Sequence, residues 1–349
     1  MNNLFFCGKG YLILGFSIVL WLTGCAPMSD LTMISVPEES GLNFVRFADD
    51  DDRVVGPVIR EVRGEISWYA PSFISISPDG EYLAYNGRKD GSDHLFIKRT
   101  SGGRSVNQRT FRNDLLDMSF SPDGEYLAFT DQTSLGNEIK LIRSLSGSSV
   151  QQITSGYSDV GPTFSPDGNE IFFTRTRTER ITNPNDMLAS SSTTIAQSYL
   201  IWSYNLESSL FTQYTEGFTP NISPDGELLI ITRNNRGTGK GEIWSVNINS
   251  GQEILILGDN ERGYSSPQIS PDGEYLAVVG STPSNRDRPA NLDIYTVKMD
   301  GSNLTQHTFH PAHDVSPVWS PDGNHIFFIS RRGSEEGRFN IWRMNMELD

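Results

Sequence analysis

The stretch Phe120–Phe129, FSPDGEYLAF, contains the motif on which the fold depends. Its core, Ser-Pro-Asp-Gly, recurs along the chain at intervals of 44, 44, 58, 47 and 50 residues. A repeat of roughly 40 to 50 residues is the length of one four-stranded blade of a β-propeller. Six copies of the motif therefore predict six blades. The copies begin at Ser77, Ser121, Ser165, Ser223, Ser270 and Ser320.

Each copy predicts a tight turn followed by a buried strand. Proline suits the second position of a type I β-turn, and glycine is favoured at the fourth. An apolar run follows the turn, as in Tyr126–Phe129. Continuous apolar runs are typical of strands that are buried on both faces. The sequence thus predicts an all-β fold, a six-bladed β-propeller with four-stranded blades.

The aspartate of the motif invites a catalytic or metal-binding interpretation, because it recurs in every copy. In a Pro-Asp-Gly turn, however, the carboxylate caps backbone N–H groups close by in the sequence. We therefore interpret these aspartates as structural. They are Asp79, Asp123, Asp167, Asp225, Asp272 and Asp322.

The sixth repeat lacks a fourth strand of its own. Its third strand is expected at Ile341–Met344, and the sequence ends at Asp349. An uncovered strand edge would recruit other chains, so a further segment is needed to cover it. The β-like segment Val54–Val62, VVGPVIREV, precedes the first repeat and is expected to close the ring.

The N-terminal segment carries the pattern of an export signal. The apolar run Tyr11–Leu22 is too short to cross a bilayer as a helix and is typical of a signal-peptide core. The residues Leu22-Thr23-Gly24-Cys25 resemble the lipobox of bacterial lipoproteins; the alternative is an ordinary secretory signal with an incidental cysteine. We expect a signal peptide over residues 1–24, lipidation at Cys25, a flexible tether over 25–53 and the propeller over 54–349.

Charge and cysteine content narrow the range of partners. The 349 residues carry a formal net charge of −15, which disfavours binding to nucleic acid or to an anionic membrane surface. Cys7 and Cys25 are the two cysteines, so the mature domain has no thiol pair for a disulfide. We expect attachment to the membrane through the lipid alone. Ala26 after the lipidated cysteine resembles the sorting pattern for the outer membrane, facing the periplasm.

The repeats resemble those of the TolB-type β-propeller family. The family pattern runs Pro-x-aromatic-Ser-Pro-Asp-Gly, then an apolar strand that ends near an arginine, then an Ile-Tyr or Ile-Trp strand. The sixth repeat has Ser316–Gly323 (SPVWSPDG), Ile326–Phe328, Arg331 and Ile341-Trp342 in this order. The resemblance covers about residues 54–349. Other repeats keep an arginine after the second strand, at Arg88, Arg175 and Arg233.

The resemblance implies a cell-envelope protein that binds a peptidoglycan-associated lipoprotein and other partners through a propeller face. Family members carry a separate α/β domain before the propeller, for which we expect no room between Cys25 and the first blade. We therefore predict a lipid-anchored, non-enzymatic module that binds an envelope protein or peptide, in envelope integrity or biopolymer transport. The alternatives are a hydrolase- or lactonase-type enzyme that acts at the central channel, and a scaffold without a discrete ligand.

One face of the ring is the expected binding site. Loops that join the fourth strand of one blade to the first strand of the next share this face, and exposed aromatic and arginine side chains on loops favour recognition. The alternative is that single rings pack at the blade ends. The insertion Thr176–Ser198 is expected on the same face, and its polar composition slightly favours disorder. The face contains Trp68, Tyr69, Asn113, Asp114, Tyr157, Asp159, Phe218, Arg262, Tyr264, His313 and Asp314.

Signals for catalysis, metals and cofactors are weak. His307, His310 and His313 occur at three-residue intervals, but on a strand end and a loop this spacing does not align the side chains on one ion. The mature sequence has no Gly-x-Ser-x-Gly motif, and Gly237–Gly241 lacks the spacing of a phosphate-binding loop. We therefore expect no catalytic residue, no metal site and no cofactor.

Overall fold

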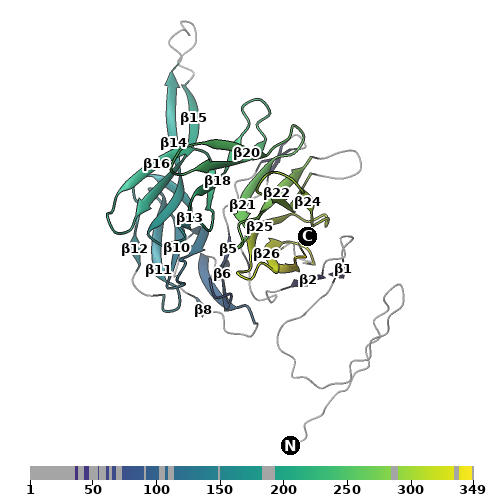
Figure 1. The fold of residues 1–349 in the computed structure, drawn as a ribbon. Coiled ribbons are helices and arrows are strands. Elements are labelled where there is room, and N and C mark those ends of the chain that lie inside the picture. The colour runs from purple at the N-terminus through teal and green to yellow at the C-terminus, as the bar shows by residue number, and fades with distance from the viewer. Residues whose placement is uncertain are drawn as a thin grey trace, which may run out of the picture.

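The computed structural model describes residues 36–37, 43–46, 54, 60–62, 65–67, 73–89, 92–101, 107–108, 114–147, 150–182, 193–283, 290–333 and 338–347. Over these residues the regular elements are all strands, and six antiparallel sheets are arranged radially around a central axis (Figure 1). The predicted six-bladed propeller is thereby confirmed. The described part of the chain has no helix that could cross a membrane. The expected signal peptide and Cys25 lie outside the described residues.

Five blades have four strands each. In all five, the strands follow one another from the axis outwards in the order in which they occur in the sequence. Blade 1 holds β5 (Ile74–Ile76), β6 (Tyr82–Lys89), β7 (Ser92–Arg99) and β8 (Asn107–Gln108), and blade 2 holds β9 (Asp114–Phe120), β10 (Tyr126–Thr133), β11 (Gly136–Arg143) and β12 (Gln151–Gln152). Blade 3 holds β13 (Ser158–Phe164), β14 (Glu170–Thr182), β15 (Thr193–Asn205) and β16 (Phe211–Glu216). Blade 4 holds β17 (Phe218–Ile222), β18 (Leu228–Asn234), β19 (Gly241–Asn247) and β20 (Glu253–Leu257), and blade 5 holds β21 (Tyr264–Ile269), β22 (Tyr275–Thr282), β23 (Asn291–Lys298) and β24 (Thr305–Gln306).

The sixth blade joins the two ends of the described chain. It contains β25 (Asp314–Trp319), β26 (His325–Ser330) and β27 (Asn340–Asn345), followed outwards by β2 (Asn43–Arg46) and β1 (Val36–Pro37). An N-terminal strand closes the ring, as predicted, but it is β2, which pairs antiparallel with β27. The prediction that Val54–Val62 is the closing strand was wrong. Part of the predicted tether therefore belongs to blade 6.

The segment Val54–Val62 has another place in the fold. Val54 is buried and forms isolated bridges to Gly87 of blade 1 and Phe339 of blade 6, so it lies at the seam between these blades. β3 (Arg60–Val62) pairs with β4 (Glu65–Ser67) in a separate two-stranded sheet.

Each Ser-Pro-Asp-Gly motif forms the turn between the first and second strands of its blade. In the first copy the amide of Gly80 donates to the carbonyl of Ser77 (2.8 Å), which closes the turn. The Ser77 hydroxyl donates to Asp79 Oδ1 (2.5 Å) and accepts from the amide of Tyr82 (2.9 Å). The same contacts recur in the other five copies, and the serine hydroxyl is the main cause that lowers the pKa of Asp79 and of Asp167. These contacts confirm the structural interpretation of the motif aspartates.

The core of the domain lies between the blades. Second strands are buried over consecutive residues, as at Leu127–Asp131 of β10, and each sheet packs against two neighbours. Leu95 of blade 1, for example, packs with Met118 and Phe129 of blade 2 in one buried cluster. Because no blade buries its own apolar residues, stability depends on the complete ring.

The insertion in blade 3 is largely β-structure, in contrast to the expected polar loop. β14 and β15 have 13 residues each and pair along their full length, from Glu170 opposite Asn205 to Thr182 opposite Thr193. Their outer halves extend beyond β13 and β16 and project from the body as a two-stranded arm (Figure 1). Residues 183–192 lie outside the described residues.

Candidate functional site

The first strands of the blades surround a cavity at the centre of the ring. This central cavity is small, with a volume of about 60 Å³. Its lining side chains come from the positions two, three and four residues before the serine of the motif, on several blades. The described residues that line it are Ile74, Ser75, Asp117, Met118, Ser119, Gly161, Pro162, Thr163, Thr219, Pro220, Asn221, Ser266, Gln268 and Val318.

A left-handed residue recurs in the strands around the cavity. Gly161, Thr219, Ser266 and Ser316 each lie four residues before the motif serine, and their φ angles are 68°, 52°, 53° and 55°. The strand register shifts at each of these positions, which identifies a β-bulge. A positive φ is unusual for a residue with a side chain, and for a β-branched residue such as Thr219 it is an outlier. Bulges redirect side chains, and these four do so where the blades meet the axis.

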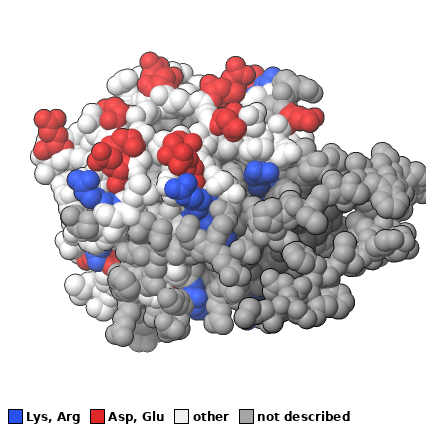
Figure 2. Space-filling view, turned by 90° about the horizontal axis from the view of Figure 1, so that it is seen from below, with Lys and Arg blue, Asp and Glu red and all other residues white. Residues whose placement is uncertain are grey.

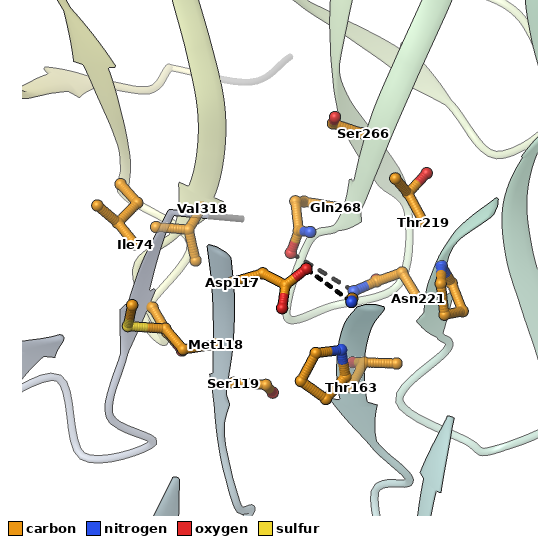
Figure 3. A pocket seen from close by; sticks show the side chains of 14 residues that line it. Ile74, Asp117, Met118, Ser119, Thr163, Thr219, Asn221, Ser266, Gln268 and Val318 are labelled. Carbon is orange, nitrogen blue, oxygen red and sulfur yellow. Dashed lines mark hydrogen bonds between the residues drawn. The ribbon is translucent and has the colours of Figure 1, made fainter. Parts of the chain in front are cut away.

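Blade 2 differs from this pattern, because Asp117 occupies the equivalent position. The side chain is 1% exposed and projects from β9 towards Asn221 and Gln268 (Figure 3). Its Oδ2 accepts a hydrogen bond from the amide of Gly161 in blade 3 (2.6 Å), whereas its Oδ1 has no hydrogen-bond partner among the described residues. Burial raises the pKa of Asp117 from 3.8 to about 7, and contacts with Thr130 and the Gly161 amide oppose this rise only in part.

The cavity has a polar and an apolar side. On the polar side, Asn221 Nδ2 donates to Gln268 Oε1 (3.4 Å), and Asn221 Oδ1 accepts from the amide of Ile269 (3.0 Å). These contacts fix the orientation of the Asn221 amide across blades 4 and 5. The apolar side is formed by Ile74, Met118 and Val318, from blades 1, 2 and 6 (Figure 3).

A second recess lies at the end of the ring from which the arm projects. We call it the hairpin groove; it lies between the base of the β14–β15 arm and blade 4 and has a volume of about 650 Å³. Aromatic and arginine side chains share it with three glutamates. Its described lining is Gln197, Ser198, Tyr199, Thr215, Glu216, Gly217, Phe218, Arg233, Asn234, Asn235, Arg236, Glu242, Trp244 and Glu253.

Four of the residues predicted to bind a partner keep some exposure. Phe218 lines the hairpin groove and stacks edge-on against Tyr199, with ring centroids 5.7 Å apart. Tyr157 is 56% exposed and covers the Arg175 guanidinium. Arg262 is half-buried over the ring of Tyr295. His313 is half-buried too, and its Nδ1 lies 3.1 Å from Asn291 Oδ1.

Three others are buried and have internal partners. The Asp159 carboxylate accepts two hydrogen bonds from Arg175, at 2.7 and 2.8 Å. Asp314 forms an ion pair with Arg332 in the equivalent place of blade 6. Tyr264 is 1% exposed and donates to Asp259. These contacts support the alternative that such side chains pack at the blade ends.

The remaining predicted residues have no described surroundings. Trp68, Tyr69 and Asn113 lie outside the described residues, and of Asp114 only the backbone is described, as the first residue of β9.

The three histidines do not converge. His307 is buried in contact with the Thr296 hydroxyl (2.7 Å), and burial lowers its pKa to about 4. His310 Nδ1 instead accepts from the amide of Ala312. Within the described residues, no three histidine, cysteine, aspartate or glutamate side chains are placed to hold a metal ion.

Sequence reasoning missed the residues that line the central cavity. Their signal was the register of the repeat, because the positions before the motif belong to the innermost strand. Four residues before the motif serine, the third to sixth copies have glycine, threonine or serine, whereas the second has Asp117 and the first has Phe73.

Comparisons with known proteins agree with the fold. The chain is 28% identical over 121 residues to the Tol-Pal system protein TolB of Francisella tularensis, an alignment that covers 34% of this chain and 26% of that protein. The structure superimposes on TolB from Acinetobacter baumannii with a TM-score of 0.59 and 21% identity, covering 77% of this chain and 64% of that one. An oligogalacturonate lyase in complex with manganese matches with a TM-score of 0.55 and 13% identity, over 91% and 96% of the two chains.

The curated relatives are matched over less than half of their own length. The family described as TolB beta propeller domain, in contrast, matches residues 69–195 and 205–348, which is most of the chain. This match includes all six motif turns. The chain therefore belongs to the TolB beta propeller domain family.

Proposed function

We propose that this protein is a lipid-anchored module of the cell envelope that binds a protein or peptide partner through the end of the propeller that carries the arm. Membership of the TolB beta propeller family supports an envelope setting. The apolar run and the Leu22–Cys25 pattern support export and lipid attachment.

The hairpin groove is the observation that carries the proposal. Tyr199, Phe218 and Trp244 lie in it together with Arg233 and Arg236. Aromatic and arginine side chains contribute most of the binding energy in protein interfaces. The Arg236 side chain is 90% exposed and so is available to a partner, although its guanidinium also contacts Glu216 (3.2 Å).

The floor of the groove is held in place before a partner arrives. Arg233 donates to both carboxylate oxygens of Glu253, at 2.9 and 3.0 Å, and to the Thr215 hydroxyl at 3.0 Å. Its guanidinium also lies 5.0 Å from the centre of the Trp244 ring. A recognition surface that is ordered in advance loses less conformational entropy on binding.

Affinity capture tests this function. The lipid-free domain, residues 26–349, serves as bait for envelope extracts, beside the variant Phe218→Ala. Phe309→Ala is the matched control, because Phe309 is 44% exposed but lies outside the hairpin groove. The wild type and Phe309→Ala should enrich the same envelope proteins, and Phe218→Ala should enrich them less at an unchanged melting temperature. Equal yields from all three baits, or no enrichment over an empty resin, would contradict the proposal.

An enzyme acting in the central cavity is the second candidate. Asp117 favours it, because a buried carboxyl group with a pKa near neutral is suited to general acid–base catalysis. The fold is also shared with an oligogalacturonate lyase. Incubation with oligogalacturonate tests this candidate: formation of an unsaturated product by the wild type but not by Asp117→Asn would favour the enzyme.

A further inference from the structure

The outer half of β15 has one edge without a neighbouring strand. β15 pairs with β14 along its full length, from Thr193 to Asn205, whereas its pairing with β16 reaches only as far as Leu200. Among the strands that the structure describes, none continues the line of β16 beyond this residue. We call this side of residues 193–199 the open edge; it belongs to the arm that projects from the body in Figure 1.

The hydrogen bonds of β15 identify the backbone groups at the open edge. The N–H and C=O groups of successive residues in a strand point alternately to its two sides. The carbonyl of Tyr199 accepts from the amide of Gly217 (2.9 Å). The amide of Asn205 donates to the carbonyl of Leu210 (2.9 Å), next to β16. Odd-numbered residues of β15 therefore face the β16 side, and the N–H and C=O of Gln197 point to the open edge.

The open edge borders the hairpin groove. Gln197, Ser198 and Tyr199 belong to the lining of this groove, together with residues 234–236 of blade 4. β16 ends at Glu216, and Gly217 leads into blade 4, so the place of a longer β16 opens to the groove. A volume of about 650 Å³ accommodates a short segment of chain and not a folded domain.

The two edges of the arm differ in charge. In the outer half of β14, residues 177–182 read RTERIT, with three charged residues, whereas residues 193–198 of β15 read TTIAQS, with neither a charge nor a proline. Charged residues and proline protect exposed strand edges from pairing with other chains. The β14 edge has this protection and the β15 edge lacks it, so the β15 edge is the one suited to accept a strand.

The charged side chains that line the groove already have partners within it. Each arginine pairs with a glutamate, and the remaining glutamate, Glu242, accepts hydrogen bonds from two other side chains of the groove, at 2.7 and 3.0 Å. A charged residue of a partner would have to compete with these contacts, which favours an occupant without charge. The arginine pairs are Arg233 with Glu253 and Arg236 with Glu216.

The opposite end of the molecule has a different character. Figure 2 shows this end, where Asp and Glu side chains gather along one rim and Lys and Arg side chains lie beside them. Such a charged rim attracts charged partners, but it offers an uncharged segment no comparable advantage. Backbone complementarity and charge thus both direct an uncharged segment to the open edge.

We propose that the partner binds as an uncharged, extended segment that adds a strand to the open edge of β15, in line with β16. Main-chain hydrogen bonds provide the affinity in this binding mode, and alternate side chains provide the specificity. The aromatic pair of Tyr199 and Phe218, with ring centroids 5.7 Å apart, is the surface for those alternate side chains. The inference rests on the proposed function, because the added strand belongs to the protein or peptide partner.

Selective N-methylation of a peptide tests this binding mode. The probe is a capped, fluorescent heptapeptide of alternating threonine and valine. Two further forms carry N-methyl groups on all valines or on all threonines, which removes the donors from one side of the peptide strand and keeps every side chain. In fluorescence anisotropy with the lipid-free domain, one methylated form should bind at least about tenfold more weakly than the parent peptide, and the other should bind nearly as well.

A proline in the arm tests the same contact from the side of the protein. Gln197→Pro removes the N–H at the open edge and leaves the hydrogen bonds to β14 in place. It should weaken binding of the parent peptide about fivefold or more at an unchanged melting temperature, whereas Gln197→Ala should bind like the wild type. Thr178→Pro is the matched control: Thr178 lies opposite Gln197, and its N–H points to the other edge of the arm.

Several results would overturn the inference. These are equal binding of the two methylated forms, no binding of the parent peptide, equal affinities of Gln197→Pro and Gln197→Ala, or tighter binding of a peptide with a central glutamate or lysine. Sedimentation of the domain alone as a dimer that Gln197→Pro dissociates would assign the open edge to a second copy of this chain instead.

Failure here and failure of the proposed function have different signatures. If envelope proteins are captured equally well by Gln197→Pro and Gln197→Ala baits, but less by Phe218→Ala, this inference falls and the binding function stands. If the peptide shows one-sided sensitivity to methylation but no partner is captured from the envelope, the proposed function falls.

Discussion

A Cβ atom built on Gly80, in the turn of blade 1, would lie 3.6 Å from Cδ of Pro321, in the turn of blade 6. The same contact joins Gly124 to Pro78 (3.5 Å) and Gly168 to Pro122 (3.7 Å). In five of the six copies the glycine therefore packs beside the proline of the neighbouring motif, and the contact of Gly80 with Pro321 joins the first copy to the last; Gly323 has no neighbour within 4 Å. The glycines adopt positive φ, 72° at Gly80, which explains why the motif requires this residue.

Ring closure by β2 predicts a strong effect of N-terminal truncation. Removing residues 1–46 takes away the strand that pairs with β27, and removing residues 1–35 leaves β1 and β2 in place. Loss of the hydrogen bonds between β2 and β27 should lower the free energy of unfolding by about 2 kcal/mol. The longer truncation should therefore melt in a single transition at a temperature lower by about 5 °C. Calorimetry of the two proteins measures this difference. Equal melting temperatures would show that β2 does not contribute to closure.

The buried ion pair of blade 3 predicts a large penalty for losing its cation. Arg175 is enclosed by Asp159 and by the rings of Tyr157 and Trp202, and Asp159 is fully buried. Arg175→Ala leaves that carboxylate uncompensated and should destabilise the fold by about 3–5 kcal/mol. Arg177→Ala is the control, because its pair with Glu179 is exposed and should contribute less than about 1 kcal/mol. Urea unfolding of both variants tests this, and similar costs would refute the assignment.

Asp117 predicts an unusual dependence of stability on pH. Its folded pKa is raised to about 7 from 3.8, so the folded state holds this proton at pH values where the unfolded state has released it. The contribution of this proton to the free energy of unfolding is fully present below about pH 4 and is lost as the pH rises towards 7. Asp117→Asn removes the decline and should be more stable than the wild type at pH 8 by on the order of 2–4 kcal/mol, with little difference near pH 4.

Urea denaturation of the wild type and Asp117→Asn at pH 4, 6 and 8 measures this effect. A constant difference between the two proteins at all three pH values would mean that Asp117 does not change protonation in this range. Asp314, whose pKa burial raises to about 6, is present in both proteins, so the difference isolates Asp117.

The sequence predicted the features that are local and repeated. The turn at Ser77–Gly80 depends on four adjacent residues, and six copies at blade spacing determine the number of sheets. The closing strand was missed because Asn43–Arg46 is four residues long and has no periodicity of its own. Its assignment depends on pairing with Asn340–Asn345, at the other end of the chain.

The candidate sites were predicted less well, because their residues meet through the fold. Asp159 and Asp314 were expected on an exposed face from their loop positions, but the first strands extend to include them. Arg175 in the second strand of blade 3 pairs with Asp159, and Arg332 just after the second strand of blade 6 pairs with Asp314. Asp117 lies in an ordinary strand sequence. Its burial and its hydrogen bond to the amide of Gly161 in blade 3 depend on neighbouring blades around the axis, and no local pattern encodes them.

Site-specific photo-crosslinking in living cells tests the central claim, that the end of the propeller with the arm binds an envelope partner. A benzophenone side chain placed at position 218, in the hairpin groove, should form a discrete crosslinked product with an envelope protein. The same group at position 309, outside the groove, should not. Crosslinking of equal intensity at both positions, or at neither, would contradict the account.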